Sequence, residues 1–255
     1  MANRPNSQTL KYWFILSLSA LLGGLLYADD RTPVIVELFT AEGCSSCPPA
    51  DQLLEKLERA QPVPEADIIV LGEHVDYWNE LGWPDRFSSH LYTERQHDYA
   101  YAFALEDIYT PQMVVNGQAQ FNGADAQRAI GEIRRAASAP HCLVSLLRKG
   151  SSDLALAVGG FPAGIKNVEI LLAITEGSLA SDVRKGENAG RRLTHTGVVR
   201  SLVSVARLDA RKSPDFKSDL PLRLAEGWGR ENLNAIALVE DRRTHRIFGA
   251  AKLKL

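Results

Sequence analysis

Residues 40–51 read TAEGCSSCPPAD and contain two of the three cysteines in the chain, Cys44 and Cys47. The segment before them, Pro33–Phe39, is rich in β-branched residues and predicts a strand. The segment after them, Pro48–Ala60, predicts a helix, because its leucines recur on one face and prolines are tolerated in a first turn. A cysteine pair placed between a strand and the start of a helix is a redox pair, a pair of metal ligands or a structural disulfide.

The segments that follow predict an α/β arrangement for the first part of the chain. Their apolar spacing and turn residues indicate a buried strand at Ala66–Val75, a long helix at Arg86–Leu105, a hairpin at Pro111–Gly123 and a closing helix at Ala124–Ala137. The expected order is β-α-β-α-β-β-α. We therefore predict an α/β domain over residues 31–139.

The pattern changes after Pro140. Residues 140–255 consist of short apolar or alternating runs separated by Gly, Pro and Asp, with little helical periodicity. Regularly spaced short strands of this kind are typical of a β-sandwich. We therefore predict a second, mainly β, sandwich-like domain over residues 140–255.

The composition is that of an ordinary globular protein. The chain has 255 residues, 45% of them hydrophobic, and a formal net charge of -2, which leaves enough apolar material for a buried core. Basic residues are not in excess, so the charge gives no indication of a nucleic-acid partner. Three cysteines are too few for a disulfide scaffold, and Cys142, left over if the other two pair, is expected to be a small buried apolar residue.

The N-terminus predicts export. Residues 1–28 contain basic Arg4 and Lys11, then an uncharged run over residues 12–28, then the polar DDRTP. This is the pattern of a secretory signal peptide, or of an N-terminal anchor if it is not cleaved. We expect a periplasmic or secreted protein that meets a membrane only through residues 12–28. In such an oxidising compartment a disulfide is chemically reasonable.

Four motifs together resemble a family of exported bacterial thioredoxin-like proteins of unassigned function. They are VELFTAEGCSSCPPAD (36–51), HVDYWNELGWPD (74–85), YTPQMVVNG (109–117) and ENAGRRLTH (187–195). The resemblance implies a thioredoxin fold for residues 31–139, with a cis-proline at Pro111 lying against the active-site disulfide. The chain departs from thioredoxin itself at Ser45 and Ser46, which replace Gly-Pro, and at Gly43, which replaces an aromatic residue. The redox poise of thioredoxin is therefore not implied.

The cysteine spacing suits thiol–disulfide exchange with a protein thiol or disulfide. Free amides and the partial positive charge at a helix N-terminus stabilise a thiolate. We expect Cys44, on an exposed turn, to attack and Cys47 to resolve the mixed disulfide, with Pro111 shaping the substrate groove. Glu37 is either a buried proton shuttle for the resolving thiol or a solvated or salt-bridged strand residue. This reading needs no cofactor.

Two alternatives use the same cysteines. His74 ends a strand, so that Cys44, Cys47 and His74 are a candidate copper site. The other alternative is a non-catalytic interaction module with a structural disulfide. An exposed Cys44 favours exchange, a convergent three-residue cluster favours copper, and burial of both sulfurs favours the module. We expect His74 to lie near the cysteines and to order the loop, by bonding an acid such as Asp76 or Asp85, or to tune the thiol.

Two further groups of polar and aromatic residues are candidates for the site. Tyr77, Trp78 and Trp83 either pack their loop or form one wall of a cleft beside Cys44. The motif at residues 187–195 is either a polar binding patch, an interdomain latch, or a solvated turn before a strand, which we favour. Its polar members are Glu187, Asn188, Arg191, Arg192 and His195.

Overall fold

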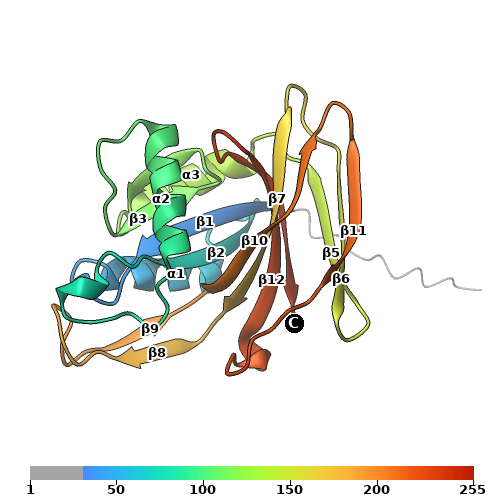
Figure 1. Ribbon diagram of the computed structural model, residues 1–255. Coiled ribbons are helices and arrows are strands. Elements are labelled where there is room, and N and C mark those ends of the chain that lie inside the picture. The colour runs from blue at the N-terminus through green and yellow to red at the C-terminus, as the bar shows by residue number, and fades with distance from the viewer. Residues whose placement is uncertain (1–30) are drawn as a thin grey trace, which may run out of the picture. The chain divides into compact units, whose positions relative to one another are not determined.

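The computed structural model describes residues 31–255, which contain thirteen strands, three α-helices and two short 3-10 helices (Figure 1). The first elements are β1 (Thr32–Thr40), α1 (Pro48–Ala60), β2 (Ala66–His74), η1 (Asn79–Leu81), α2 (His90–Phe103), β3 (Gln112–Val115), β4 (Ala119–Asn122) and α3 (Ala126–Ala137). The later ones are β5 (Leu143–Lys149), β6 (Asp153–Gly159), β7 (Asn167–Glu176), β8 (Leu179–Asp182), β9 (Arg192–His195), β10 (Val198–Asp209), β11 (Asp215–Pro221), η2 (Arg230–Asn232), β12 (Leu233–Asp241) and β13 (Ile247–Lys254). The predicted signal peptide or anchor at residues 1–28 lies outside the described residues.

Strands from both parts of the chain join in one sheet. Its order is β13-β12-β7-β10-β2-β1-β3-β4, and a separate three-stranded sheet has the order β11-β6-β5. Strands β8 and β9 form a small hairpin of their own. The protein is therefore a mixed α/β structure with a large, mainly β sheet and few helices.

The predicted order β-α-β-α-β-β-α is found over β1 to α3. Strands β1 and β2 are parallel and pair from Thr32 with Ala66 to Thr40 with His74, so both end at one edge of the sheet. Strand β3 runs antiparallel to β1. Leucines of α1 and Ile133 of α3 fill the core on one face, whereas α2 covers the other face (Figure 1).

Helix α2 is shorter than the sequence predicts. It begins at His90 and not at Arg86, because Ser89 is the N-cap and its hydroxyl oxygen accepts a hydrogen bond from the Leu91 N–H. It ends at Phe103, after which Ala104 takes a left-handed conformation. The residues before the cap remain free to form the loop that approaches the cysteines.

Two glycines let the sheet continue from β2 to β10. A Cβ atom on Gly197 would lie 2.7 Å from the carbonyl oxygen of Val70, and Gly197 has a φ of +57°. A Cβ atom on Gly72 would lie 3.1 Å from the carbonyl oxygen of Thr196. Only residues without a side chain allow this close approach. The change of pattern near residue 140 therefore marks a change in secondary structure and not a break in the sheet.

The later strands pack as a sandwich. Sheet β11-β6-β5 faces β7, β12 and β10 across one apolar core, to which Leu154 and Leu156 contribute from one side and Ile170 and Leu172 from the other. Residues 31–255 are grouped in one compact unit. Within that range, no helix is long and apolar enough to cross a membrane.

Candidate functional site

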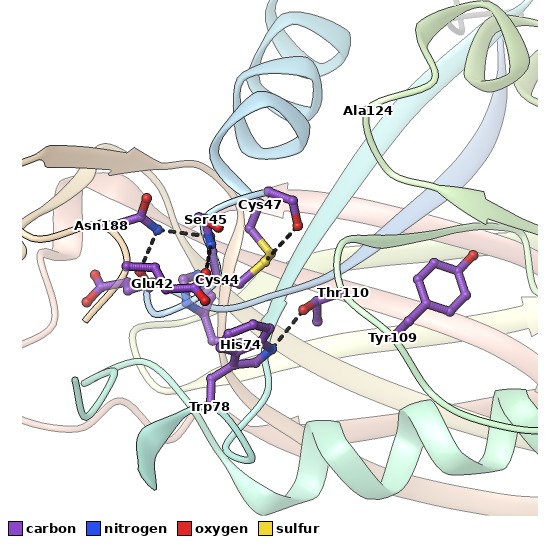
Figure 2. Close-up of a disulfide and its surroundings, with 12 residues drawn as sticks. Glu42, Cys44, Ser45, Cys47, His74, Trp78, Tyr109, Thr110, Ala124 and Asn188 are labelled. Carbon is purple, nitrogen blue, oxygen red and sulfur yellow. Dashed lines mark hydrogen bonds between the residues drawn. A yellow bond between two sulfur atoms is a disulfide. The ribbon is translucent and has the colours of Figure 1, made fainter. Parts of the chain in front are cut away.

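Cys44 and Cys47 form a disulfide at the start of α1 (Figure 2). Their Cα atoms are 5.4 Å apart, and Cys47 is the N-cap residue of the helix. The preceding strand β1 ends beside β2, so the bridge lies at the carboxyl edge of the two parallel strands. In open α/β sheets this edge is the usual place for a functional site.

Both cysteines are fully buried, with 0% of each residue exposed. The sequence predicts an exposed Cys44, and that prediction is wrong for the conformation described. The bridge packs in an apolar cluster with Phe39 and Tyr99, while Ser45 and Ser46 between the cysteines remain exposed. The local sequence alone therefore does not explain the burial.

The cover comes from the loop that joins β8 to β9, residues 183–191, which we call the cap loop. Its Asn188 side chain is buried and donates hydrogen bonds to the carbonyl oxygens of Glu42 at 2.8 Å and Cys44 at 2.9 Å (Figure 2). The Ser45 N–H donates to the Glu187 carboxylate at 3.0 Å. The residues between β1 and α1, 41–47, form what we call the cysteine loop. The motif predicted as a solvated turn is thus a latch over this loop.

Trp78 links the cysteine loop to the residue before the predicted cis-proline. Its ring packs against the apolar cluster around the disulfide, and its indole N–H donates to the Thr110 hydroxyl at 2.8 Å (Figure 2). The Thr110–Pro111 bond is cis, as predicted. Pro111 lies close to α1, since a Cβ atom on Gly123 would approach both Pro111 and Ala50.

His74 is held by an acid, as predicted. Its Nδ1 lies 2.6 Å from the Asp85 carboxylate, which also accepts the Glu42 N–H at 2.9 Å and so ties the pair to the cysteine loop. Burial raises the pKa of Asp85, but the charge and hydrogen bond of His74, together with the N–H groups of Glu42 and Phe87, outweigh this effect and lower the pKa to about 2. Burial lowers the pKa of His74, but the charge and hydrogen bond of Asp85 outweigh this effect, so the pKa of His74 is raised overall.

Among residues 31–255, no group of three or more His, Cys, Asp and Glu side chains is arranged to hold a metal ion.

We expect the His74→Gln substitution to destabilise the protein more at pH 5.5 than at pH 8.5. The raised folded-state pKa means that the His74–Asp85 pair stabilises fully below the ordinary His pKa of 6.5 and loses this contribution as pH rises through the folded-state value. Urea unfolding of wild type and variant at both pH values measures the difference. His97→Gln, at an exposed position on α2, is the control. A difference that grows with pH would contradict the assignment.

A second histidine–carboxylate pair joins the β8–β9 hairpin, which we call the cap hairpin, to the cysteine loop. His195 Nε2 on β9 lies 3.2 Å from the Glu42 carboxylate, and the Trp83 indole N–H donates to the same carboxylate at 2.7 Å. Burial raises the pKa of Glu42, but the hydrogen bonds with His195, Ser181 and Trp83 together outweigh this effect, so its pKa is lowered. The rings of His74 and His195 meet edge to face with centroids 4.7 Å apart. The two pairs therefore form one buried polar cluster beside the disulfide.

Asp51 is a buried carboxyl group near the cysteines that the sequence analysis missed. Its N–H donates to the Cys47 carbonyl oxygen, one turn earlier in α1, so both residues lie on one face of the helix. Burial raises the pKa of Asp51, and nearby His195 and His74 offset part of that shift. The signal was present in the sequence, since Asp51 precedes Leu54 by three residues on the face predicted to be apolar.

Glu37 is salt-bridged, which is one of the two arrangements expected for it. Its carboxylate accepts hydrogen bonds from the Arg95 guanidinium at 2.7 Å and from the Tyr99 hydroxyl at 2.5 Å. Arg95 also donates to Glu240 on β12 at 3.0 Å. Sequence reasoning did not find Arg95, because its partners come from distant strands. The contacts of Glu37 give no support for a role as proton shuttle.

The other candidates divide by burial. Tyr77 is exposed at the surface and donates to Gln96, and Arg191 and Arg192 are exposed on the cap hairpin. Cys142 is a buried free thiol, as predicted, and burial raises its pKa to about 12. It is therefore unsuited to act as a nucleophile.

A family model described as "Protein of unknown function (DUF1223)" matches residues 35–240. This range includes all the residues of the candidate site described above. The family description names no activity, so it identifies relatives without identifying a reaction. No curated protein matches the chain.

Two solved structures are similar to the chain to different degrees. A crystal structure of a protein from Agrobacterium tumefaciens, a structural genomics target, has 27% identity and a TM-score of 0.70, and the match covers 88% of this chain and 94% of that one. A domain of the outer membrane lipoprotein Omp28 from Porphyromonas gingivalis has 12% identity over 46% of this chain and 88% of that one. Its TM-score of 0.25 is too low to carry an argument.

Proposed function

The chain belongs to the family of proteins of unknown function DUF1223, and from the site itself we propose that it is an exported thiol–disulfide exchange protein that acts through Cys44 and Cys47. The observation that carries the proposal is the disulfide at the N-terminus of α1, at the carboxyl edge of β1 and β2. The partial positive charge at this helix end stabilises a thiolate in a way that an arbitrary loop does not, although Pro48 and Pro49 supply no N–H of their own.

The arrangement around the bridge supports a thioredoxin-like affiliation. The order β2-β1-β3-β4, with parallel β1 and β2 and an antiparallel β3, is the arrangement that the resemblance implies. The cis peptide bond before Pro111, just ahead of β3, supports the same affiliation. The large sheet then extends this unit through β10, which adds a further set of strands beyond the α/β part.

The proposed exchange starts from the oxidised form. A thiolate of a partner protein attacks the sulfur of Cys44, a new intermolecular disulfide forms, and Cys47 leaves as a thiolate. A second partner thiol, after losing its proton, displaces Cys44. The partner thereby loses two electrons and the cysteine pair gains them. The same steps in reverse reduce a partner disulfide.

Asp51 is the residue we propose to exchange a proton with Cys47. It lies one helical turn from Cys47 on the same face, where side chains at this spacing are about 5–6 Å apart at Cβ. Burial raises the pKa of Asp51, which favours its protonated form. Glu37, the residue first considered for this role, is instead engaged by Arg95 and Tyr99.

The proposal includes a place of action outside the reducing cytoplasm. Disulfides persist in the periplasm and in secreted proteins. The substrate is a protein thiol or disulfide, and a membrane is met only through residues 12–28 if that segment is retained. No nucleic-acid or metal partner is needed. The copper alternative has less support, because Cys44 and Cys47 are joined to each other and no group of three or more His, Cys, Asp and Glu side chains in the described part of the chain is arranged to hold a metal ion.

The burial of both cysteines favours a second candidate function. In that case the disulfide fixes the cysteine loop, and the protein is a non-catalytic interaction module. The two candidates differ in whether the cap loop ever opens. They therefore make different predictions for the redox behaviour of the bridge.

We expect the purified protein to catalyse thiol–disulfide exchange, with a reduction potential for Cys44–Cys47 above about -300 mV, the level below which structural disulfides fall. Equilibration with glutathione or dithiothreitol buffers gives the potential. Oxidative refolding of a reduced test protein gives the activity, with Cys44→Ser as the inactive control. A potential well below that level together with no activity above the control would establish the non-catalytic module instead.

A further inference from the structure

The strand β10 has an open edge along most of its length. It pairs with β7 from Val198 to Asp209, but on its other side it pairs with β2 only at Val198. From residue 200 onward, no strand within residues 31–255 occupies that side. An open edge presents unpaired backbone N–H and C=O groups, and these select an extended polypeptide as the occupant.

On the sandwich face of this edge lies an apolar cavity of about 350 Å³. Val203 and Val205 of β10 line it together with Leu172, Ile174 and residues 220–223. Arg223 is the one charged residue among these lining residues. This side of the edge therefore suits apolar side chains.

On the opposite face lies a cavity of about 300 Å³ with a different character. Arg86 and Arg200 line it, and no carboxylate does. Arg86 donates to the carbonyl oxygen of Ala180, a neutral partner, and Arg200 lies 3.5 Å from Glu176. Because Glu176 offsets the charge of Arg200, the net positive charge on this side comes from Arg86, and it suits an acidic side chain.

We propose that the β10 edge binds an extended segment of a partner protein in which apolar residues alternate with acidic residues. Successive side chains of an added strand point to opposite faces, so one set enters the apolar cavity and the other faces the arginines. Val203 lines both cavities and is 50% exposed. A second copy of this chain is a poor occupant, because pairing two β10 edges would bring the same arginines together.

The test uses the full chain and a capped, fluorescein-labelled peptide of four valine–glutamate repeats. Fluorescence anisotropy should show saturable binding of the peptide. Val203→Glu should weaken this binding at least about tenfold, because the new carboxylate repels the glutamates of the peptide and takes up space at the β10 edge. The matched control is Leu147→Glu, an apolar-to-acidic change at a position on β5 that is 60% exposed. It should leave binding unchanged.

Two peptide controls separate strand addition from simpler attraction. A valine–lysine peptide should bind at least about tenfold more weakly, because it opposes the arginines. A valine–glutamate peptide N-methylated at alternate residues should lose binding if it is methylated on the edge that pairs with β10. No saturable binding, equal binding of every N-methylated peptide, or no effect of Val203→Glu would each overturn the proposal. A dimer of the protein alone that Val203→Glu dissociates would also overturn it and assign the edge to a second copy.

Discussion

Replacing Asn188 with alanine is expected to speed reduction of the Cys44–Cys47 disulfide by dithiothreitol about 30- to 150-fold. The side chain donates two hydrogen bonds to the cysteine loop, at 2.8 and 2.9 Å. At about 1–1.5 kcal/mol each, their loss favours the open cap loop by about 2–3 kcal/mol. If the buried bridge reacts only when the loop opens, the rate rises in proportion to the open population.

Stopped-flow or quenched reduction, followed by thiol labelling, measures this rate at several dithiothreitol concentrations. Arg192→Ala is the matched control, since Arg192 lies on the same hairpin but pairs at the surface with Asp182. Its rate should stay within about twofold of wild type, because exposed ion pairs contribute little. Circular dichroism confirms that each variant is folded. Equal rates for Asn188→Ala and wild type would show that the cap loop is not the barrier.

The predictions that succeeded depend on local sequence. The strand before Cys44 and the helix after Cys47 are specified by residues within a few positions of each other. The Asn116–Gly117 turn adopts positive φ at both residues, as a short hairpin requires. The contact of His74 with Asp85 joins residues eleven positions apart in one loop. In each case the deciding contact lies within the segment whose pattern was analysed.

The features that the sequence does not reveal depend on segments far apart in sequence. The burial of Cys44 requires Asn188, which lies 144 positions away. The residues around Cys44 carry no information about that distant loop. Because serines follow Cys44, the local pattern alone indicates an exposed turn. The passage of the sheet from β2 to β10 rests on one pairing, Val198 with Gly72. The two glycines that permit it look like ordinary turn residues in a single sequence.

The buried carboxyl groups show a related limit. Asp51 and Glu37 are acidic residues, and residue type alone assigns them to a solvated face, even though Asp51 lies on the predicted apolar face of its helix. Their burial is tolerated because distant groups compensate for it, including His195 near Asp51 and Arg95 beside Glu37. Charge compensation across a fold is invisible in the spacing of one segment. It is visible only when the partner strands are placed.

Replacing Arg95 with methionine is expected to destabilise the protein by about 3–5 kcal/mol, because it leaves buried carboxylates without their positive partner. Arg95 on α2 binds Glu37 on β1 at 2.7 Å and Glu240 on β12 at 3.0 Å, and it lies 3.7 Å from Glu73 on β2. The one guanidinium therefore holds α2 against strands from both parts of the large sheet. Urea unfolding at pH 7 measures the loss.

The effect of pH distinguishes lost charge compensation from lost packing. Burial raises the pKa of Glu240, but Arg95 and His245 together outweigh this effect, so the pKa is lowered and the ionised Glu240 stabilises the protein above the ordinary value of 4.5. This contribution is lost as pH falls through the folded-state value, so the difference between wild type and Arg95→Met should shrink from pH 7 to pH 4. Arg135→Met, in an exposed ion pair with Glu132, is the control and should change stability by less than about 1 kcal/mol. An Arg95→Met effect that is the same at both pH values would mean that the methylene packing of Arg95, and not its charge, holds the helix to the sheet.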